Sequence, residues 1–173
     1  MKFEFSLEGS SDAKASLKSF SSFASLKSLL NKAAKLVAQT ELPNFKEVRI
    51  QIVLLSDDEL LQINRTALTH DYLTDIITFE IERTASELES EIYISVDRAQ
   101  ENAKRYRVEA ERELEHLVIH GVLHLAGMRD KTMAESNQMR RRERWFLSKL
   151  KTAVQGSSSS RPALKRKRSR ARQ

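Results

Sequence analysis

The sequence predicts a mixed α and β domain of the α+β class. Apolar and polar residues alternate in four short segments, near residues 3–7, 48–54, 77–81 and 92–96, which is typical of strands with one buried face. Between and after these segments, apolar residues recur at helical spacing. Strand and helix patterns alternate along the N-terminal part and helices dominate the C-terminal part, so the two kinds of element are expected to share one core.

Capping signals mark the ends of about five predicted helices. Ser56 followed by Glu59 has the form of a capping box, and Thr132 followed by Glu135 repeats it. Gly127 is placed where a glycine commonly ends a helix. The predicted helices cover residues 12–38, 57–67, 97–106, 110–126 and a last segment that begins near residue 132.

Composition limits both the class of protein and the chemistry of any metal site. The chain has no cysteine, so a metal ion must be held by His, Asp or Glu. It has no apolar run of about 18 residues, so no membrane span is expected. The N-terminus "MKFEFSLEGS" lacks the apolar core of a signal peptide, and we therefore expect a cytoplasmic protein with no membrane partner.

The basic charge of the chain is concentrated at its C-terminus. Residues 161–173, "RPALKRKRSRARQ", hold seven of the 30 basic residues and no acidic one, which leaves 23 basic against 24 acidic residues elsewhere. The preceding "GSSSS" is typical of a flexible linker. We expect a folded domain over residues 1–152 and a flexible basic tail over residues 153–173.

The tail has two interpretations that stay open. Lys165, Arg166, Lys167 and Arg168 can contact RNA phosphates without reading sequence. Alternatively the tail is a disordered extension with no specific role, because no aromatic residues are interleaved for base stacking.

Three of the four histidines lie on one face of the strongest predicted helix, at His116, His120 and His124. They cannot all bind one ion, because a rise of about 1.5 Å per residue separates the first and last by roughly 12 Å. The pair is therefore either 116 with 120 or 120 with 124. The second pair has a third candidate nearby, Asp130, which follows the turn at Gly127. Two His and one carboxylate leave a fourth zinc position open, although a buried histidine can also simply satisfy a hydrogen bond.

The residues around this pair leave the general base unassigned. Gly121 stands where the zinc-protease pattern H-E-x-x-H has its glutamate. Glu113 lies two turns before His120 and is a candidate to orient that ring, or is a solvated charge. His116 is interpreted as a structural or surface residue. Activation of water by the metal therefore rests on His120 and its partners rather than on a neighbouring acid.

The stretch "HGVLHLAGMRD" resembles the YbeY family of bacterial rRNA maturation endoribonucleases, whose pattern is H-G-x-L-H-L-x-G-Y-D-H. His120 and His124 fall on the first two metal ligands of the family. Asp130 falls on the position of the third ligand, usually His, and a carboxylate is also a legitimate zinc ligand. Met128 replaces the tyrosine of the pattern.

Two further blocks extend the resemblance over roughly residues 1–150. "INRTALTHDYLTDIITF" matches the family stretch L-N-x-x-Y-R-x-x-D-x-P-T-D-V-L-S-F at Asn64, Asp71, Thr74, Asp75 and Phe79. It departs where the chain has Leu68 instead of an arginine implicated in activity. "EIYISVDRAQENA" is similar to the family's G-D-I-x-I-S strand and following helix.

The resemblance implies a mixed four-stranded β-sheet packed with helices around a central metal-binding helix. It also implies one Zn²⁺ per chain, held by His120, His124 and Asp130, in an endoribonuclease that cleaves single-stranded RNA. The implied roles are processing of the small-subunit rRNA 3′ end and ribosome quality control, with ribosomal small-subunit proteins or assembly factors as partners.

Alternatives to this function remain open. Arg129 and Lys131 can position phosphates beside Asp130, or they belong to a solvated turn. The chain can instead be an RNA-binding ribosome assembly factor with a structural zinc, to which Leu68 lends weight, or a metal-dependent hydrolase of another substrate such as a peptide. The missing H-E-x-x-H glutamate counts against peptide cleavage, and three ligands count against a structural zinc, which usually has four.

Overall fold

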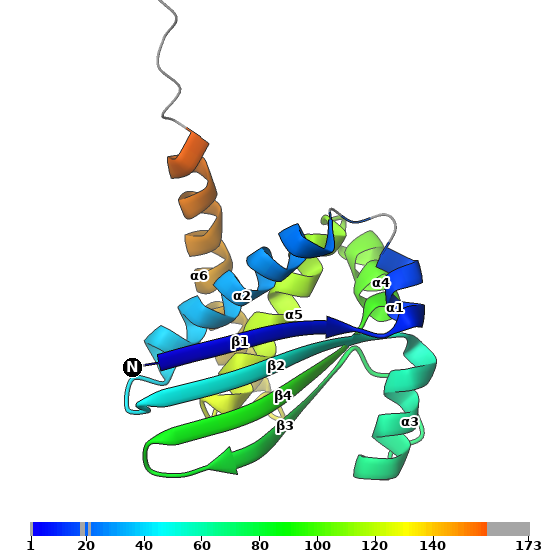
Figure 1. Ribbon diagram of the computed structural model, residues 1–173, viewed down its shortest axis with the longest axis horizontal. Helices are drawn as coiled ribbons and strands as arrows, with labels where there is room; N and C mark the ends of the chain where they lie inside the picture. Colours follow the sequence, from blue (N-terminus) through cyan, green and yellow to red (C-terminus); the bar gives the residue numbers. More distant parts are fainter. Residues whose placement is uncertain (1, 18–19, 21, 159–173) are drawn as a thin grey trace, which may run out of the picture.

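A computed structural model describes the backbone of residues 2–17, 20 and 22–158, and the side chains of these residues up to 151. The described residues form four strands and six helices, which confirms the α+β class (Figure 1). The strands are β1 (Lys2–Gly9), β2 (Glu47–Leu55), β3 (Ile76–Arg83) and β4 (Glu87–Ser95). The helices are α1 (Ser11–Ser16), α2 (Phe23–Glu41), α3 (Asp57–Leu68), α4 (Val96–Tyr106), α5 (Ala110–Leu125) and α6 (Met133–Ser158).

The four strands form one mixed sheet in the order β1-β2-β4-β3. β2 pairs in parallel with both β1 and β4, and β3 pairs antiparallel with β4. Alternate residues of β2 and β4 are buried, as expected for strands with one face on the core. The mixed four-stranded sheet implied by the sequence resemblance is therefore confirmed.

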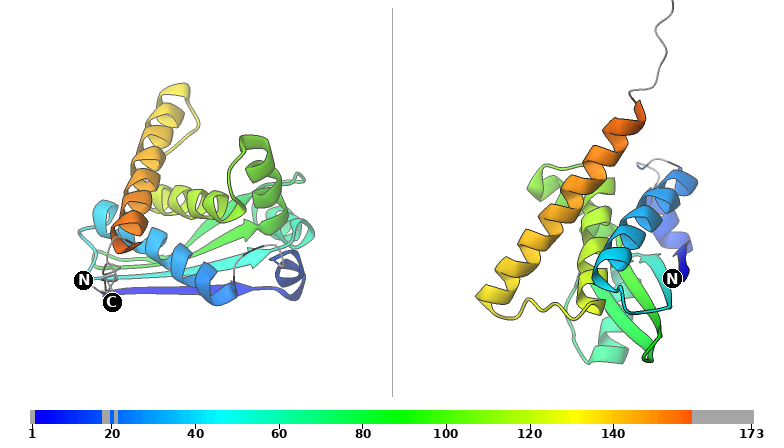
Figure 2. Two further views of the ribbon diagram at one scale, coloured as in Figure 1. Left: turned by 90° about the horizontal axis from the view of Figure 1, so that it is seen from above. Right: turned by 90° about the vertical axis from the view of Figure 1, so that its left-hand side faces the viewer.

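Helices cover the two faces of the sheet unequally. The main core lies between one face and the helices α2 and α5, and α6 packs outside them on α5 and α2 (Figure 2). α3 covers part of the opposite face over a small cluster of Leu55, Leu60 and Ile77. The histidine-bearing helix α5 is thus central, with the sheet on one side and α6 on the other.

Gly121 lets α5 approach the sheet closely. A Cβ atom at this position would lie 3.0 Å from Ile92 Cδ1, 3.1 Å from Thr78 Oγ1 and 3.2 Å from Ile76 Cδ1. A glutamate here would therefore meet the sheet. The residue after His120 faces β3 and β4, and this packing explains why the chain lacks the glutamate of H-E-x-x-H.

The predicted helix over residues 12–38 is instead two helices. α1 ends at Ser16 and α2 begins after Ser22, whose side chain accepts a hydrogen bond from the backbone N–H of Ser25. A serine at that point competes for backbone hydrogen bonds and favours a new helix start. Residues 18, 19 and 21 lie outside the described part of the chain.

Smaller differences concern element ends. α4 is capped by Ser95, two residues before the predicted start, and its side chain accepts from the backbone N–H of Arg98. The capping boxes at Ser56 and Thr132 are confirmed. α6 extends to Ser158, beyond the predicted domain boundary at residue 152. No helix in the described part of the chain combines the length and apolar character needed to cross a membrane.

Candidate metal centre

The turn that follows α5 brings Asp130 back to the histidines. Gly127 has a φ of +90°, a conformation that favours glycine. Its N–H donates to the carbonyl of His124 at 2.9 Å, and the N–H of Met128 donates to the carbonyl of Leu123 at 3.0 Å. These two bonds form a Schellman motif, which reverses the chain directly after the helix.

His120, His124 and Asp130 form one cluster of potential ligands in the described part of the chain. The Nε2 atoms of the two histidines are 2.9 Å apart, and each lies 3.7 Å from Oδ2 of Asp130. Ligand atoms of a tetrahedral zinc site are separated by about 3.3 Å, given bonds of about 2.0–2.1 Å. The observed separations lie on either side of this value, so the three atoms fit around one ion with small adjustments.

Hydrogen bonds at the other ring nitrogens point both Nε2 lone pairs at the same space. Nδ1 of His120 lies 2.7 Å from Glu143 Oε1, and Nδ1 of His124 lies 2.9 Å from the carbonyl oxygen of Met128. A carboxylate and a carbonyl only accept, so both Nδ1 atoms carry the proton. Two neutral imidazoles would then face each other with lone pairs, an arrangement that a shared cation stabilises. The residues present therefore fit a metal ion.

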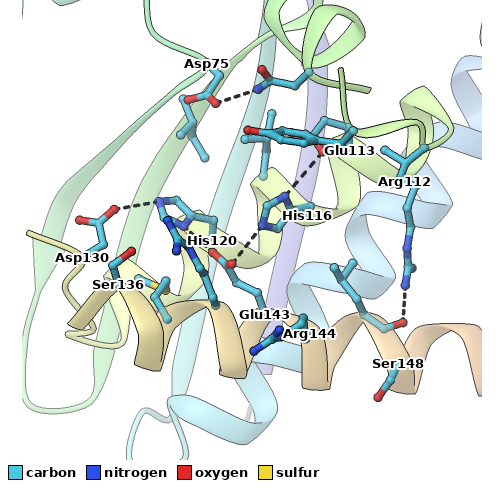
Figure 3. Close-up of a pocket in the computed structure, with 18 of the residues that line it drawn as sticks. Asp75, Arg112, Glu113, His116, His120, Asp130, Ser136, Glu143, Arg144 and Ser148 are labelled. Carbon is cyan, nitrogen blue, oxygen red and sulfur yellow. Dashed lines mark hydrogen bonds and ion pairs between the residues drawn. The ribbon is translucent and has the colours of Figure 1, made fainter. Parts of the chain in front are cut away.

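Glu143, on α6, is a site residue that the sequence did not reveal. Its side chain is 8% exposed, and its second carboxylate oxygen lies 3.1 Å from Nε2 of His116 (Figure 3). One carboxylate thus holds both His116 and His120. A signal was present in the sequence, because Glu143 shares its helix face with the apolar residues Met139, Phe146 and Leu150.

The structure places Glu113 beside His116 rather than His120. Its carboxylate lies 3.6 Å from Nδ1 of His116 and is buried. The partner of His120 is Glu143, so the role considered for Glu113 falls to a residue of the next helix. His116, interpreted as structural or surface, is partly buried between these two carboxylates.

The buried charges shift the pKa values of this group. Burial disfavours the charged form of His116, but Glu113 and Glu143 outweigh it and raise the pKa of His116 to about 9. Burial acts to raise the pKa of Glu143, but His116 and His120 lower it to about 2. Burial and the neighbouring His120 lower the pKa of His124, which favours the neutral form that ligates metal.

The cluster opens onto a large cavity between α4, α5 and α6. This cavity has a volume of about 1080 Å³, and His120 and Asp130 contribute to its wall. Asp75, at the start of β3, lines it as well and accepts a hydrogen bond from Asn102 (Figure 3). A molecule that enters this cavity therefore meets His120 and Asp130 of the ligand cluster.

Other residues singled out in the sequence lie elsewhere. Arg129 and Lys131 are exposed and are not part of the cavity wall, although they flank Asp130. Leu68 is an exposed residue at the end of α3 and does not line the cavity either. The basic tail residues Lys165, Arg166, Lys167 and Arg168 lie outside the described residues.

Comparisons with known proteins identify the family of this chain. A sequence model of the family Endoribonuclease YbeY matches residues 13–151. An Endoribonuclease YbeY of Cytophaga hutchinsonii is 42% identical over 101 residues, which cover 58% of this chain and 71% of that protein. One from Amoebophilus asiaticus is 39% identical over 104 residues, covering 60% of this chain and 71% of that protein.

A solved structure shares the fold. The solution structure of TM1509 from Thermotoga maritima is similar with a TM-score of 0.53 and 22% identity, covering 94% of this chain and 99% of that one. The family match begins in α1 at residue 13 and ends in α6 at residue 151, so it includes every residue of the ligand cluster and Glu143. On this evidence the chain belongs to the YbeY family of endoribonucleases.

Proposed function

We propose that this protein is a zinc-dependent endoribonuclease that cleaves single-stranded RNA during maturation of the small-subunit rRNA 3′ end and ribosome quality control. The observation that carries the proposal is the convergence of His120, His124 and Asp130 on one point at the wall of an open cavity. Ribosomal RNA as substrate also suggests a cytoplasmic location and partners among small-subunit proteins or assembly factors.

The three residues leave room for chemistry at a fourth position. Zinc held by two His and one carboxylate supplies a Lewis acid and an activated water for phosphodiester cleavage. Glu143 fixes the ring of His120, and the carbonyl of Met128 fixes the ring of His124. These two contacts keep the proton of each ring on Nδ1, so that Nε2 is available to a metal ion.

His116 supports the same site from one turn away. Its raised pKa keeps it protonated at neutral pH, so its positive charge offsets part of the negative charge of the buried carboxylates of Glu113 and Glu143. Without that cation, the buried carboxylate of Glu143 would be stabilised only by its hydrogen bond with His120. The geometry of His120 therefore depends on a chain of contacts that runs from Glu113 through His116 to Glu143.

The rival functions fit these contacts less well. A structural zinc usually has four protein ligands, whereas the cluster in the described residues supplies three. A peptide hydrolase of the H-E-x-x-H type needs a glutamate at the position of Gly121, which packs against the sheet. Three candidate ligands beside a cavity therefore favour a catalytic metal over a structural one.

Metal removal and reloading test the proposal. Wild-type protein treated with a chelator should not cleave a single-stranded rRNA fragment, and adding zinc should restore cleavage. His120→Ala should lose metal and activity together, since two remaining ligands hold zinc poorly. His70→Ala is a matched control, because His70 is exposed and stacks on Tyr72 away from the cavity. Zinc content equal to wild type in His120→Ala, or cleavage without metal, would refute the proposal.

A further inference from the structure

Three cations on α6 line the cavity that contains His120. Arg140, Arg144 and Lys151 are separated by four and seven residues, which places them along one face of the helix. All three are exposed, and Figure 3 shows Arg144 on the same helix as Glu143. The side chain that holds His120 and the cations of the cavity wall therefore come from one rigid element.

These cations differ from Arg112 and Arg142 in having no partner among the described residues. Arg112 donates to Glu115 and to the carbonyl of Leu147, and Arg142 pairs with Glu41. No described acidic residue lies within ion-pair distance of Arg140, Arg144 or Lys151. Their charges are free for a ligand, whereas Arg112 lines the same cavity but is already engaged in structure.

The acidic residues of the cavity wall are already engaged. Glu113 and Glu143 contact His116, Asp75 accepts a hydrogen bond from Asn102, and Asp130 lies beside His120. The negatively charged side chains of the cavity wall therefore lie near the ligand cluster, and each of them contacts a neighbouring side chain. Unpartnered positive charge lies along α6, so the cavity presents a cationic wall to an incoming polyanion.

The spacing of the cations suits a chain of phosphates. A helical rise of about 1.5 Å per residue separates positions 140 and 144 by about 6 Å and positions 144 and 151 by about 10 Å. A single phosphate at the metal centre would not need three cations spread along the helix. We propose, resting on the proposed function, that Arg140, Arg144 and Lys151 bind successive backbone phosphates of a single-stranded RNA that runs along α6 from the metal centre.

Tyr106 supplies a contact for a base on another wall of the same cavity. It ends α4, is 59% exposed and lines the cavity together with Val108. An exposed aromatic ring stacks on an unpaired base but not on one inside a duplex. Phosphates on α6 and a base on Tyr106 together select single-stranded RNA.

A charge-matched pair of double variants tests the phosphate contacts. Arg140→Gln/Arg144→Gln removes two cations from the cavity wall. Arg141→Gln/Lys149→Gln removes two exposed cations from the same helix that do not line the cavity. Binding of a fluorescent single-stranded RNA to the chelated full chain is measured over a salt series. The first variant should bind RNA more weakly than wild type. The slope of log affinity against log salt concentration should be smaller by about 1.4, because each lost phosphate contact removes about 0.7. The control variant should match wild type in both.

The base contact is tested separately with the same RNA. Tyr106→Ala should weaken binding, Tyr106→Phe should retain it, and Tyr72→Ala should have no effect, because Tyr72 is exposed away from the cavity. Loss of affinity in Tyr106→Phe equal to that in Tyr106→Ala would refute stacking.

Cleavage by the zinc-loaded proteins separates failure of this inference from failure of the proposed function. The Arg140/Arg144 variant should have a raised KM and a nearly unchanged kcat. Equal salt slopes in both double variants, with wild type still cleaving, overturn the inference alone. Absence of cleavage by wild type overturns the proposed function, while the binding slopes still report on the cationic wall.

Discussion

Glu143 is the single residue on which the geometry of the candidate metal centre depends most. It is buried on α6, yet its two oxygens contact His120 and His116 on α5 at 2.7 and 3.1 Å. A buried carboxylate is stable only when its charge is balanced and its oxygens are hydrogen-bonded. Glu143 therefore links the orientation of a metal ligand to the packing of two helices.

Replacing this carboxylate should weaken metal binding without removing a ligand. Glu143→Gln keeps the shape of the side chain but loses the charge that holds His120, so zinc affinity should fall about 10–100-fold. Competition with a chromophoric chelator measures the change. Glu113→Gln is the matched control, because the carboxylate of Glu113 contacts His116 and, among the described ion pairs, not His120, so its zinc affinity should stay much closer to wild type. Equal losses in both variants would contradict the role of Glu143.

His116 should make the stability of the metal-free protein depend on pH. Its folded pKa of about 9 lies above the ordinary value of 6.5, so its protonated form stabilises the folded state. This contribution is complete below pH 6.5 and is lost as pH rises from 6.5 to 9. Urea unfolding of wild type and His116→Gln at several pH values should show a difference that shrinks over this window. A difference that grows with pH would reverse the sign and refute the assignment.

At the scale of one element, α5 combines a tight sheet contact with an open site. Gly121 faces the sheet, and His120 and His124 lie on a side that is partly exposed. The helical period separates the two faces within a single turn. α5 carries both the candidate metal ligands and residues packed in the core. The sheet therefore sets the position of α5, and with it the positions of His120 and His124.

Enlarging Gly121 should therefore destabilise the fold. Gly121→Val adds branched atoms against Ile92, Thr78 and Ile76, and overpacking of this kind costs about 1–3 kcal/mol. Gly121→Ala should cost less, since it adds a single methyl group rather than a branched side chain and alanine favours helix by about 1 kcal/mol. Urea unfolding provides both free energies. A Gly121→Val protein as stable as wild type would show that α5 can move away from the sheet.

At the scale of the whole molecule, charge is divided between a folded body and a basic end. The seven basic residues of 161–173 account for the net charge of +6, because the remaining residues are nearly balanced. We therefore expect RNA recognition by the body to depend on local features such as the cavity wall, and recognition by the tail to depend on charge alone.

Removing residues 159–173 should separate these contributions. The deletion leaves in place all the core residues and candidate ligands found in the described part of the chain, so zinc content and thermal stability should match those of the full chain. RNA affinity should fall, and the salt dependence of binding should become shallower, because fewer counterions are released. Anisotropy titrations at several salt concentrations measure the slope. An identical slope would mean that the tail does not contact RNA and is a simple extension.

The sequence by itself determined what depends on neighbours along the chain. Strand alternation, the capping boxes at Ser56 and Thr132, and the i, i+4 placement of His120 and His124 all follow from local periodicity. The approach of Asp130 also follows from a local signal, the glycine that ends α5. These features are short-range, so a linear pattern contains them.

Only the tertiary structure decided which distant residues complete the site. Glu143 is 23 positions from His120, and it reaches that ring because α6 packs across α5. The same packing brings the second oxygen of Glu143 to His116 and aligns Arg140 and Arg144 with the cavity. The choice of partner depends on how two helices cross, which is fixed by side chains buried between them, and no period in the sequence encodes that crossing.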